Sequence, residues 1–352
     1  MRSPAERVWL LADDVTGACD AGAAFLCAGH AVRVWFGPKA LFPAAETAQA
    51  FHTASRALAP EAAADAVSRA AAGLALDSDT ILFKKIDSAG RGPIAAELLA
   101  LHRALGTRAV LLAPAFPAAG RTVRSGILEV RDGCGLVAQI DLRAWFAPEI
   151  RDAMVTISDA GEIAPALACG KTVLVGDSVT QCDLDALARA AGPLPGLLYA
   201  GSAGLARAIS SLHPVAAPAA PAPVAARTLV IAGTSHRVTA LQLAALEQRA
   251  HGCGDVQILR IECRYDGDAK VRAACASFDP EALIVTGGDT AQFVAEALGA
   301  HSILLHGEFA PGIPWGRLQG GMAEGRIVVT KSGGFGSATA LIDIVAALSG
   351  VA

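Results

Sequence analysis

The sequence predicts an α/β protein of two doubly wound domains, each with a mainly parallel sheet, facing each other across an interdomain cleft. Short apolar runs rich in β-branched residues alternate with helical stretches, which is typical of parallel sheets. At 352 residues the chain exceeds the usual size of one hydrophobic core, so two domains are expected. A proline-rich and alanine-rich segment, residues 214–227, separates residues 1–213 from residues 228–352 and is a predicted linker.

In the first domain the predicted strands lie within RVWLLADD, HAVRVWF, TILFKKID, AVLLAPAF, KTVLVGDS and LLYAGSAG. In the second they lie within RTLVIAGTS, VQILRIE, EALIVTGGDT, SILLHGE and RIVVTKSGGFG, with helices at about 238–250, 290–299 and 337–349. Gly, Ser, Thr and Asp gather at the carboxyl ends of these strands. Open α/β sheets bind ligands at that edge, so each domain is expected to offer a cleft.

Composition excludes several classes of protein. The formal net charge is −4, from 29 Lys and Arg against 33 Asp and Glu, and the chain has no long basic run, so no nucleic-acid partner is expected. The start MRSPAERVWLLADD does not resemble a signal peptide, and no apolar run reaches the roughly 18 residues of a membrane span. We therefore expect a cytoplasmic protein without a membrane partner. The 8 cysteines form no CxxC pair, and most of them are expected to be small core residues.

The segment ADDVTGACDAG follows the first predicted strand and opens a helix that is expected to end near Gly29. Asp13 and Asp14 lie on the turn between them, where successive side chains point to opposite faces, so at most one is well aimed at a ligand. Alternatively, one aspartate caps the helix and the other is solvated. Asp20, one turn into the helix, is expected to be structural.

Two lysines, an aspartate, a serine and an arginine converge at the end of TILFKKIDSAGRGP. Strand alternation puts Lys85 and Asp87 on one face and Lys84 on the other. Together with Ser88 and Arg91, they would suit a carboxylate or phosphate group of a substrate. An ordinary surface ion pair between Lys85 and Asp87 is the alternative.

The segment LLAPAFPAAGRTVRSG runs from a strand into a loop with two arginines, Arg121 and Arg124. It is either a rigid loop that binds an anion or a solvated turn. We count Arg121 among the candidate substrate-binding residues.

Three glycine turns in the second domain follow strands and precede helices, in AGTSHR, TGGDTA and TKSGGFG. Free backbone N–H groups at a helix start attract phosphate, so three such turns on neighbouring strands favour a nucleotide site. None has the spacing of a P-loop or of a dinucleotide fold, and each could be only a tight turn. His236 is expected to be a surface residue. The candidate nucleotide-binding residues are Ser235, Gly287, Gly288, Asp289, Thr290, Lys331, Gly333 and Gly334.

Six segments occur in one order along the chain, namely LADDVTGACDAG, FKKIDSAGRGPIAAEL, APAFPAAGRTV, YAGSAGLA, TGGDTA and TKSGGFG. This set resembles the four-carbon acid-sugar kinase family, which includes 3-oxo-tetronate, D-threonate and D-erythronate kinases. The resemblance spans nearly the whole chain. It implies that the first domain holds the acid sugar, that the second holds ATP, and that phosphate goes to the terminal (C4) hydroxyl.

When the motifs are matched residue by residue, the resemblance implies that the substrate is bound by Asp13, Asp14, Lys85, Asp87, Ser88 and Arg91. Phosphoryl transfer is mostly positioning and charge neutralisation, with a carboxylate to accept the hydroxyl proton. The expected catalytic residues are therefore Asp14 and Asp13, Asp14 being favoured as the base. No metal-ligand spacing is evident, so Mg²⁺ is expected to arrive with ATP.

The chain departs from the family in three places. The family usually reads KKxDSTxRGN, whereas KKIDSAGRGP has Ala89 and Pro93 in place of the threonine and the asparagine. The region from about 126 to 170 is short and lacks an acidic, proline-containing segment. GTSHRVTALQ has a threonine where a glycine–serine pair is common. These changes leave open which four-carbon acid is the substrate.

Two other functions and the oligomeric state stay open on the sequence. A sensor that binds an acid sugar without catalysis is conceivable because SAGRGP is altered. A ribokinase-type sugar kinase also has a glycine–alanine–aspartate turn at a helix start, although that turn is expected late in the chain. A homodimer is one option for the assembly.

Overall fold

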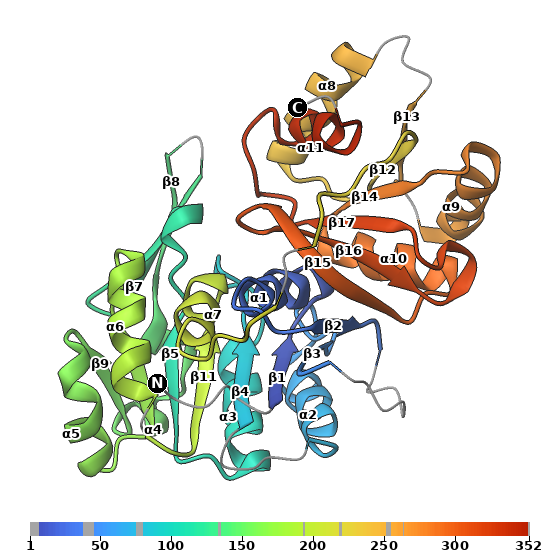
Figure 1. The fold of residues 1–352 in the computed structure, drawn as a ribbon. Coiled ribbons are helices and arrows are strands. Elements are labelled where there is room, and N and C mark those ends of the chain that lie inside the picture. The colour runs from blue at the N-terminus through green and yellow to red at the C-terminus, as the bar shows by residue number, and fades with distance from the viewer. Residues whose placement is uncertain are drawn as a thin grey trace.

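One sheet runs through the whole of the computed structural model, which describes residues 7–37, 46–74, 80–132, 135–192, 194–217, 220–250, 255–262 and 264–350 (Figure 1). Within these residues the sheet has 14 strands in the order β13-β12-β14-β17-β16-β15-β2-β3-β1-β4-β11-β5-β10-β9. The first half contributes β1 (Arg7–Ala12), β2 (Val32–Trp35), β3 (Ala48–His52), β4 (Thr80–Lys85), β5 (Ala109–Ala113), β9 (Met154–Ile157), β10 (Val173–Gly176) and β11 (Leu197–Gly201). The second half contributes β12 (Thr228–Ala232), β13 (Val256–Arg260), β14 (Ala282–Thr286), β15 (Ser302–Ala310), β16 (Ile313–Gln319) and β17 (Ile327–Lys331).

The predicted α/β class is confirmed, and the two half-sheets are joined edge to edge. All neighbouring strands of the first half are parallel, whereas β15 and β16 are antiparallel to their neighbours. The joint is the antiparallel pair β2 and β15, in which Trp35 lies opposite Ser302 and Arg33 opposite Leu304. Arg33 Nη1 also donates a hydrogen bond to Ser302 Oγ at 3.0 Å, which adds a side-chain contact between β2 and β15.

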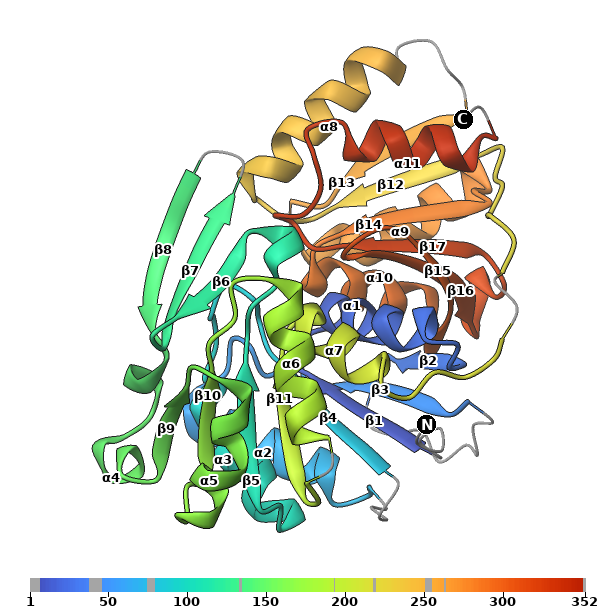
Figure 2. The ribbon, with the colours of Figure 1, turned by 60° about the vertical axis from the view of Figure 1, so that its left-hand side comes forward.

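The helices cover both faces of the sheet (Figure 2). In the first half, α2 and α3 pack together on one face, while α1 packs against α7, and α7 against α6, on the other. In the second half α8 contacts α11, and α9 contacts α10. Their bounds are α1 (Val15–Cys27), α2 (Pro60–Ala71), α3 (Ile94–Leu105), α4 (Pro148–Arg151), α5 (Ile163–Ala168), α6 (Gln181–Ala191), α7 (Ala203–Ser210), α8 (Arg237–Ala250), α9 (Arg264–Phe278), α10 (Gly288–Leu298) and α11 (Ala340–Leu348).

Helix α1 lies at the junction of the two halves, and every residue from Val15 to Phe25 is buried (Figures 1 and 2). Small side chains permit this position. A Cβ on Gly22 would lie 3.0 Å from both Leu305 Cδ1 and Val32 Cγ1, on the two strands of the joint. The glycines and alanines of this helix therefore let α1 pack directly on the joint between the half-sheets.

A separate antiparallel sheet of three strands, which we call the arm, projects beside the first half (Figure 2). It consists of β6 (Arg121–Arg124), β7 (Ile127–Asp132) and β8 (Gly135–Asp141). The sequence analysis expected a loop around Arg121 and Arg124, and it missed these strands.

Both halves reverse their strand order at one point. In the first half, β2 and β3 lie on one side of β1, and β4 lies on its other side. In the second half, β13 lies on one side of β12, and β14 lies on its other side. Open α/β sheets form a crevice at such points, outside the carboxyl ends of the strands. The ends of β1, β4, β12 and β14 are therefore where a ligand site is expected.

The segment predicted as the linker contacts both halves where the structure describes it. The N–H of Val215 donates to Ala28 at 2.7 Å, and that of Ala225 donates to Leu348 at 2.8 Å. The exact division into domains stays a prediction. In the described part of the chain, no helix has both the length and the apolar surface to cross a membrane.

Candidate functional site

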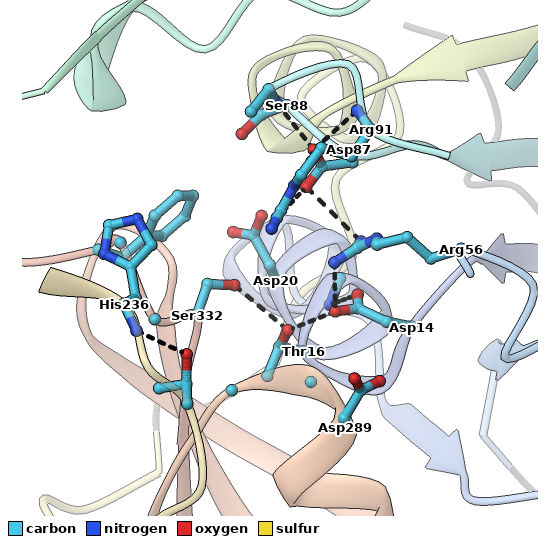
Figure 3. A pocket seen from close by; sticks show the side chains of 18 of the residues that line it. Asp14, Thr16, Asp20, Arg56, Asp87, Ser88, Arg91, His236, Asp289 and Ser332 are labelled. Carbon is cyan, nitrogen blue, oxygen red and sulfur yellow. Dashed lines mark hydrogen bonds and ion pairs between the residues drawn. The ribbon is translucent and has the colours of Figure 1, made fainter. Parts of the chain in front are cut away.

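A cavity of about 500 Å³ opens where the carboxyl ends of β1 and β4 face those of β12, β14 and β17 (Figure 3). Both halves of the chain and the arm line it. The first half supplies Asp14, Thr16, Gly17, Asp20, Arg56, Lys85, Asp87, Ser88, Ala89, Arg91 and Arg121, the arm supplies Val130, Asp132 and Val137, and the second half supplies residues 233–236, 287–290 and 332–335.

Asp14 fixes the first turn of α1. It has an extended backbone (φ −145°), and its Oδ1 accepts the N–H of Gly17 at 2.7 Å. Its Oδ2 accepts the hydroxyl of Thr16 at 2.9 Å. A Cβ on Gly17 would lie 2.6 Å from Asp14 Oδ1, so the cap needs glycine there. Asp14 is thus a helix cap, as one alternative from the sequence had it, but the other aspartate, Asp13, is buried and not solvated as that alternative expected.

Arg56, which the sequence analysis did not single out, binds both aspartates. Its Nε and Nη2 donate to the two oxygens of Asp13 at 2.7 and 2.8 Å, and its Nη1 donates to Asp14 Oδ2 at 2.8 Å. Nη2 is also 3.7 Å from Asp87 Oδ1. Burial would raise the pKa of Asp13, but the guanidinium of Arg56 holds that pKa below its usual value. Arg56 thereby lets the buried carboxylate of Asp13 stay ionised inside the protein.

Asp87 accepts hydrogen bonds from the side chain of Arg91 and from two backbone N–H groups. Arg91 Nε and Nη2 donate to its two oxygens at 2.8 and 2.7 Å, and the N–H groups of Ala89 and Arg91 donate at 3.2 and 3.1 Å. Although burial opposes ionisation, these bonds hold the pKa of Asp87 well below its usual range. The side chain of Arg91 is 62% exposed, so part of its guanidinium remains open to the pocket that it lines. Ser88 lies beside this pair in the pocket wall.

The two lysines of β4 point to opposite faces of the sheet. Lys84 is fully buried, and its Nζ lies 2.7 Å from Glu97 Oε2 of α3. Lys85 lines the pocket, and its Nζ donates to the carbonyl of Ile86 at 2.9 Å. The structure therefore brings Lys85 and Asp87 together in one wall, with Lys84 behind it.

Asp20 also lies in the pocket wall, although the sequence suggested a purely structural residue (Figure 3). Its Oδ2 is 3.9 Å from Lys85 Nζ, and its Oδ1 is buried without a hydrogen-bond partner in the described part of the chain. Burial raises the pKa of Asp20 to about 6.

Arg121, a candidate for substrate binding, is mostly buried at the base of the arm. Its Nη1 donates to the carbonyls of Ala119 and Arg131, and its guanidinium lies 5.5 Å from the ring centroid of Phe335. Its Nε has no hydrogen-bond partner among the residues that the structure describes. Burial lowers the pKa of Arg121. Arg121 thus joins the first half to a loop of the second.

The three glycine turns lie on the adjacent strands β12, β14 and β17 and face the pocket together. Helix α10 begins at Gly288, and the preceding Gly287 has φ 100°, a conformation that favours glycine. A Cβ on Gly288 would lie 2.0 Å from Asp14 Oδ2, so the two halves touch there. Ser332 Oγ donates to Thr16 Oγ1 at 3.2 Å across the same boundary.

Of the candidate nucleotide-binding residues, all but Lys331 line the pocket; these are Ser235, Gly287, Gly288, Asp289, Thr290, Gly333 and Gly334. Lys331 is fully buried behind the loop, where its Nζ donates to the carbonyls of Ser332 and Phe335 at 3.0 and 3.1 Å. Its position suits holding the loop better than contact with a ligand. His236 is exposed, as expected, and it also lines the pocket beside Gly334.

No group of three or more His, Cys, Asp or Glu side chains that could hold a metal ion is found in the part of the chain described here. Asp14 and Asp289 nevertheless place carboxylates along the wall. Such oxygens suit a hard cation whose remaining ligands come from elsewhere.

Family models match each half of the chain. Residues 8–144 match a sugar-binding N-terminal domain, and residues 267–341 match a nucleotide-binding C-terminal domain. These matches contain most residues of the pocket wall, and residues 233–236 lie outside them.

Several known proteins are similar along almost the whole chain. A D-threonate kinase of Bordetella bronchiseptica is 31% identical over 95% of this chain and 96% of its own length. A 3-oxo-tetronate kinase of Brucella melitensis is 27% identical over 71% of this chain and 74% of its own length. Solved structures of a Salmonella typhimurium protein (TM-score 0.72, 19% identity, 96% of this chain and 98% of that one) and a Haemophilus influenzae protein (0.67, 20%, 97% and 100%) share the fold.

The Arg56 network predicts a stability that depends on pH. Arg56→Gln leaves Asp13 and Asp14 without their counter-ion and should lower the free energy of unfolding by about 3–5 kcal/mol at pH 7. The pKa of Asp13 is depressed in the folded state, so its contribution exists above its unfolded pKa and is lost as pH falls. The loss should therefore shrink toward pH about 4, where the freed carboxylates protonate.

Urea unfolding at the two pH values measures this effect. Arg69→Gln, which alters an exposed arginine in the last turn of α2, is the matched control and should change stability by less than about 0.5 kcal/mol. An equal loss for Arg56→Gln at both pH values would contradict the electrostatic explanation.

Proposed function

This chain belongs to the four-carbon acid-sugar kinase family and is a phosphotransferase, and we propose that it uses ATP to phosphorylate the terminal (C4) hydroxyl of threonate, erythronate or 3-oxo-tetronate. One observation carries the proposal. A single cavity has cationic side chains of the sugar-binding half on one side and three glycine turns of the nucleotide-binding half on the other.

On the sugar side, the substrate carboxylate would meet Arg91, Lys85 and Arg121. Arg91 keeps part of its guanidinium exposed while Asp87 holds the rest, so it is oriented before a ligand arrives. Arg121 has an unpartnered Nε among the described residues. A guanidinium and an ammonium both suit a carboxylate, and Ser88 could bond a hydroxyl. This set supports a small acidic polyol.

On the nucleotide side, the phosphates would meet the turns after β12, β14 and β17. In the described part of the chain, no side chain caps the start of α10, which presents the positive end of a helix dipole and so favours phosphate. Ser235, Asp289, Thr290 and Gly333 complete this side of the wall. Phosphoryl transfer between the two sides needs mainly positioning and neutralisation of charge.

Magnesium fits this site as an ion that the nucleotide phosphates carry, since the wall offers scattered carboxylates and no cage. Asp14 and Asp289 are the residues that would hold it. When bound, the ion would neutralise charge on the phosphate oxygens. The chain's own contribution is to orient the acid with Arg91 and Lys85 and to bring the hydroxyl toward the phosphate.

The proposal is tested by ATP consumption over a panel of D- and L-threonate, erythronate and 3-oxo-tetronate, with five-carbon acids as controls. We expect turnover with at least one four-carbon acid and production of its 4-phosphate, identified by NMR. Binding of acid and nucleotide without any turnover would instead favour a sensor. Turnover with neutral sugars alone would favour a ribokinase-type enzyme.

Arg91→Ala should weaken binding of the acid by about 1.5–3 kcal/mol, the range for a hydrogen bond to a charged group. Calorimetry with the acid and with its neutral amide analogue measures this loss. The amide should bind the original protein poorly and be discriminated less by the variant. Arg103→Ala, on α3 and outside the pocket wall, is the control. Equal losses for acid and amide would mean that Arg91 acts only on structure.

Gly288→Ala should weaken nucleotide binding while acid binding changes little. The new Cβ would meet the Asp14 carboxylate at 2.0 Å, so the start of α10 must move away from the pocket. Titration calorimetry with ATP and with the acid separates the two affinities. Gly37→Ala, where a Cβ meets nothing within 4 Å, is the matched control. An unchanged ATP affinity would argue against a phosphate site at this turn.

A further inference from the structure

Three carboxylates around the pocket have guanidinium partners. Asp13 and Asp14 share Arg56, and Asp87 is held by Arg91. The guanidinium charges hold the pKa values of Asp13 and Asp87 below their usual value, which makes these two carboxylates weak proton acceptors. Both oxygens of Asp14 already accept hydrogen bonds, from Gly17, Thr16 and Arg56. These three groups therefore suit binding and orientation better than proton transfer.

Among the residues that the structure describes, no guanidinium is bonded to Asp20. Its Oδ1 is buried and has no hydrogen-bond partner in the described part of the chain. Gly312 lies close by, since a Cβ on that glycine would be 3.6 Å from this oxygen. Its Oδ2 is 3.9 Å from Lys85 Nζ, which is beyond hydrogen-bond distance. Only 4% of Asp20 is exposed, and that surface opens into the cavity that it lines (Figure 3). Oδ2 is therefore the oxygen that a bound hydroxyl can reach.

Charged groups from several elements surround Asp20. Lys85 comes from β4, Arg207 from α7 and Glu308 from β15, and Asp14 caps the same helix. Arg207 Nη2 and Glu308 Oε2 are 2.5 Å apart, so these two charges partly cancel. Burial is the main cause that raises the pKa of Asp20 to about 6, while Lys85 lowers it and Glu308 raises it. A carboxyl group that ionises just below neutral pH can accept a proton and release it again.

We propose that Asp20 is the catalytic base that takes the proton from the accepting hydroxyl of the acid sugar, an inference that rests on the proposed function. The hydroxyl O–H bond breaks and its proton passes to Asp20 Oδ2. The hydroxyl oxygen forms a bond to the γ-phosphorus of the nucleoside triphosphate. The bond from that phosphorus to the β,γ-bridging oxygen breaks, and the nucleoside diphosphate leaves with the electron pair. Asp20 then releases the proton to water.

The first test compares Asp20→Asn with Asp14→Asn in single-turnover rapid-quench assays, which isolate phosphoryl transfer from product release. Asp20→Asn should slow transfer about 10²–10⁴-fold. Its KM for the acid should change far less, and its melting temperature should stay the same or rise, because a buried charge is removed. Asp14→Asn should lower the melting temperature, because the cap of α1 and the Arg56 bridge both weaken. Asp65→Asn, exposed on α2, is the control and should change neither quantity.

Two results would overturn the proposal. One is a transfer rate for Asp20→Asn within about tenfold of the original rate. The other is a large loss confined to Asp14→Asn at unchanged melting temperature, which would make Asp14 the base. If the unmodified chain phosphorylates no four-carbon acid, the proposed function has failed, and that outcome is distinct from both.

The pH profile provides a test that does not need the Asp20 variant to fold. The transfer rate of the original chain should fall as pH decreases through about 6, because Asp20 becomes protonated. Glu308→Gln removes a negative charge that favours the protonated form, so this limb should move to lower pH by roughly 0.5–1 unit. The neighbouring Cys19 thiol does not titrate there, since burial raises its pKa to about 12. An unmoved limb would overturn the proposal.

Discussion

The antiparallel pairing of β2 with β15 is the constraint on which the site depends. In a flat sheet this pairing would leave the carboxyl ends of β1 and β14 at opposite edges, since the parallel strands of the two halves then run in opposite directions. Six strand-to-strand steps separate β1 from β14, and a twist of roughly 20–25° per step accumulates to roughly 120–150°. The twist therefore swings the two sets of carboxyl ends toward each other. In Figure 2 the strands of the second half accordingly run across those of the first.

The charges of the first half are largely paired inside the protein itself. Arg56 forms ion pairs with Asp13 and Asp14. Behind the sheet, Lys84 Nζ lies 2.7 Å from Glu97 Oε2. A buried ion pair of this kind adds little net stability, but an arrangement that buried either charge without its partner would be strongly destabilised. A slip of one residue along β4 would exchange Lys84 with its neighbour and bury the wrong ammonium. The pair with Glu97 thus helps to determine which lysine faces the pocket.

The parts of the fold and site that the sequence predicted are those with a local signal. Apolar runs ending in Gly, Ser, Thr or Asp identified most parallel strands, and helix starts placed the turns at Gly287 and Gly333 on neighbouring strands. The strands β3, β9 and β16 were missed because AQAFH and MVTI are short and IPWGRLQ contains proline and glycine. Arg56 was missed because it lies in a loop, and its partners are set by the pairing of β3 with β1. The place of Asp20 in the pocket wall was not predicted, because its position in the helix does not reveal that a hairpin of the other half covers it.

Two helices point their N-terminal ends at the same cavity, α1 from the first half and α10 from the second. Each end carries the partial positive charge of its helix dipole. They can approach closely because Gly288 has no side chain: a Cβ there would lie 2.0 Å from Asp14 Oδ2. Gly17 leaves room for the cap of α1, since a Cβ on it would lie 2.6 Å from Asp14 Oδ1. A reaction that moves a highly charged phosphoryl group gains most from donors fixed in place beforehand, because little reorganisation is then needed. Glycine at these two positions is thus a requirement of the electrostatics as much as of the packing.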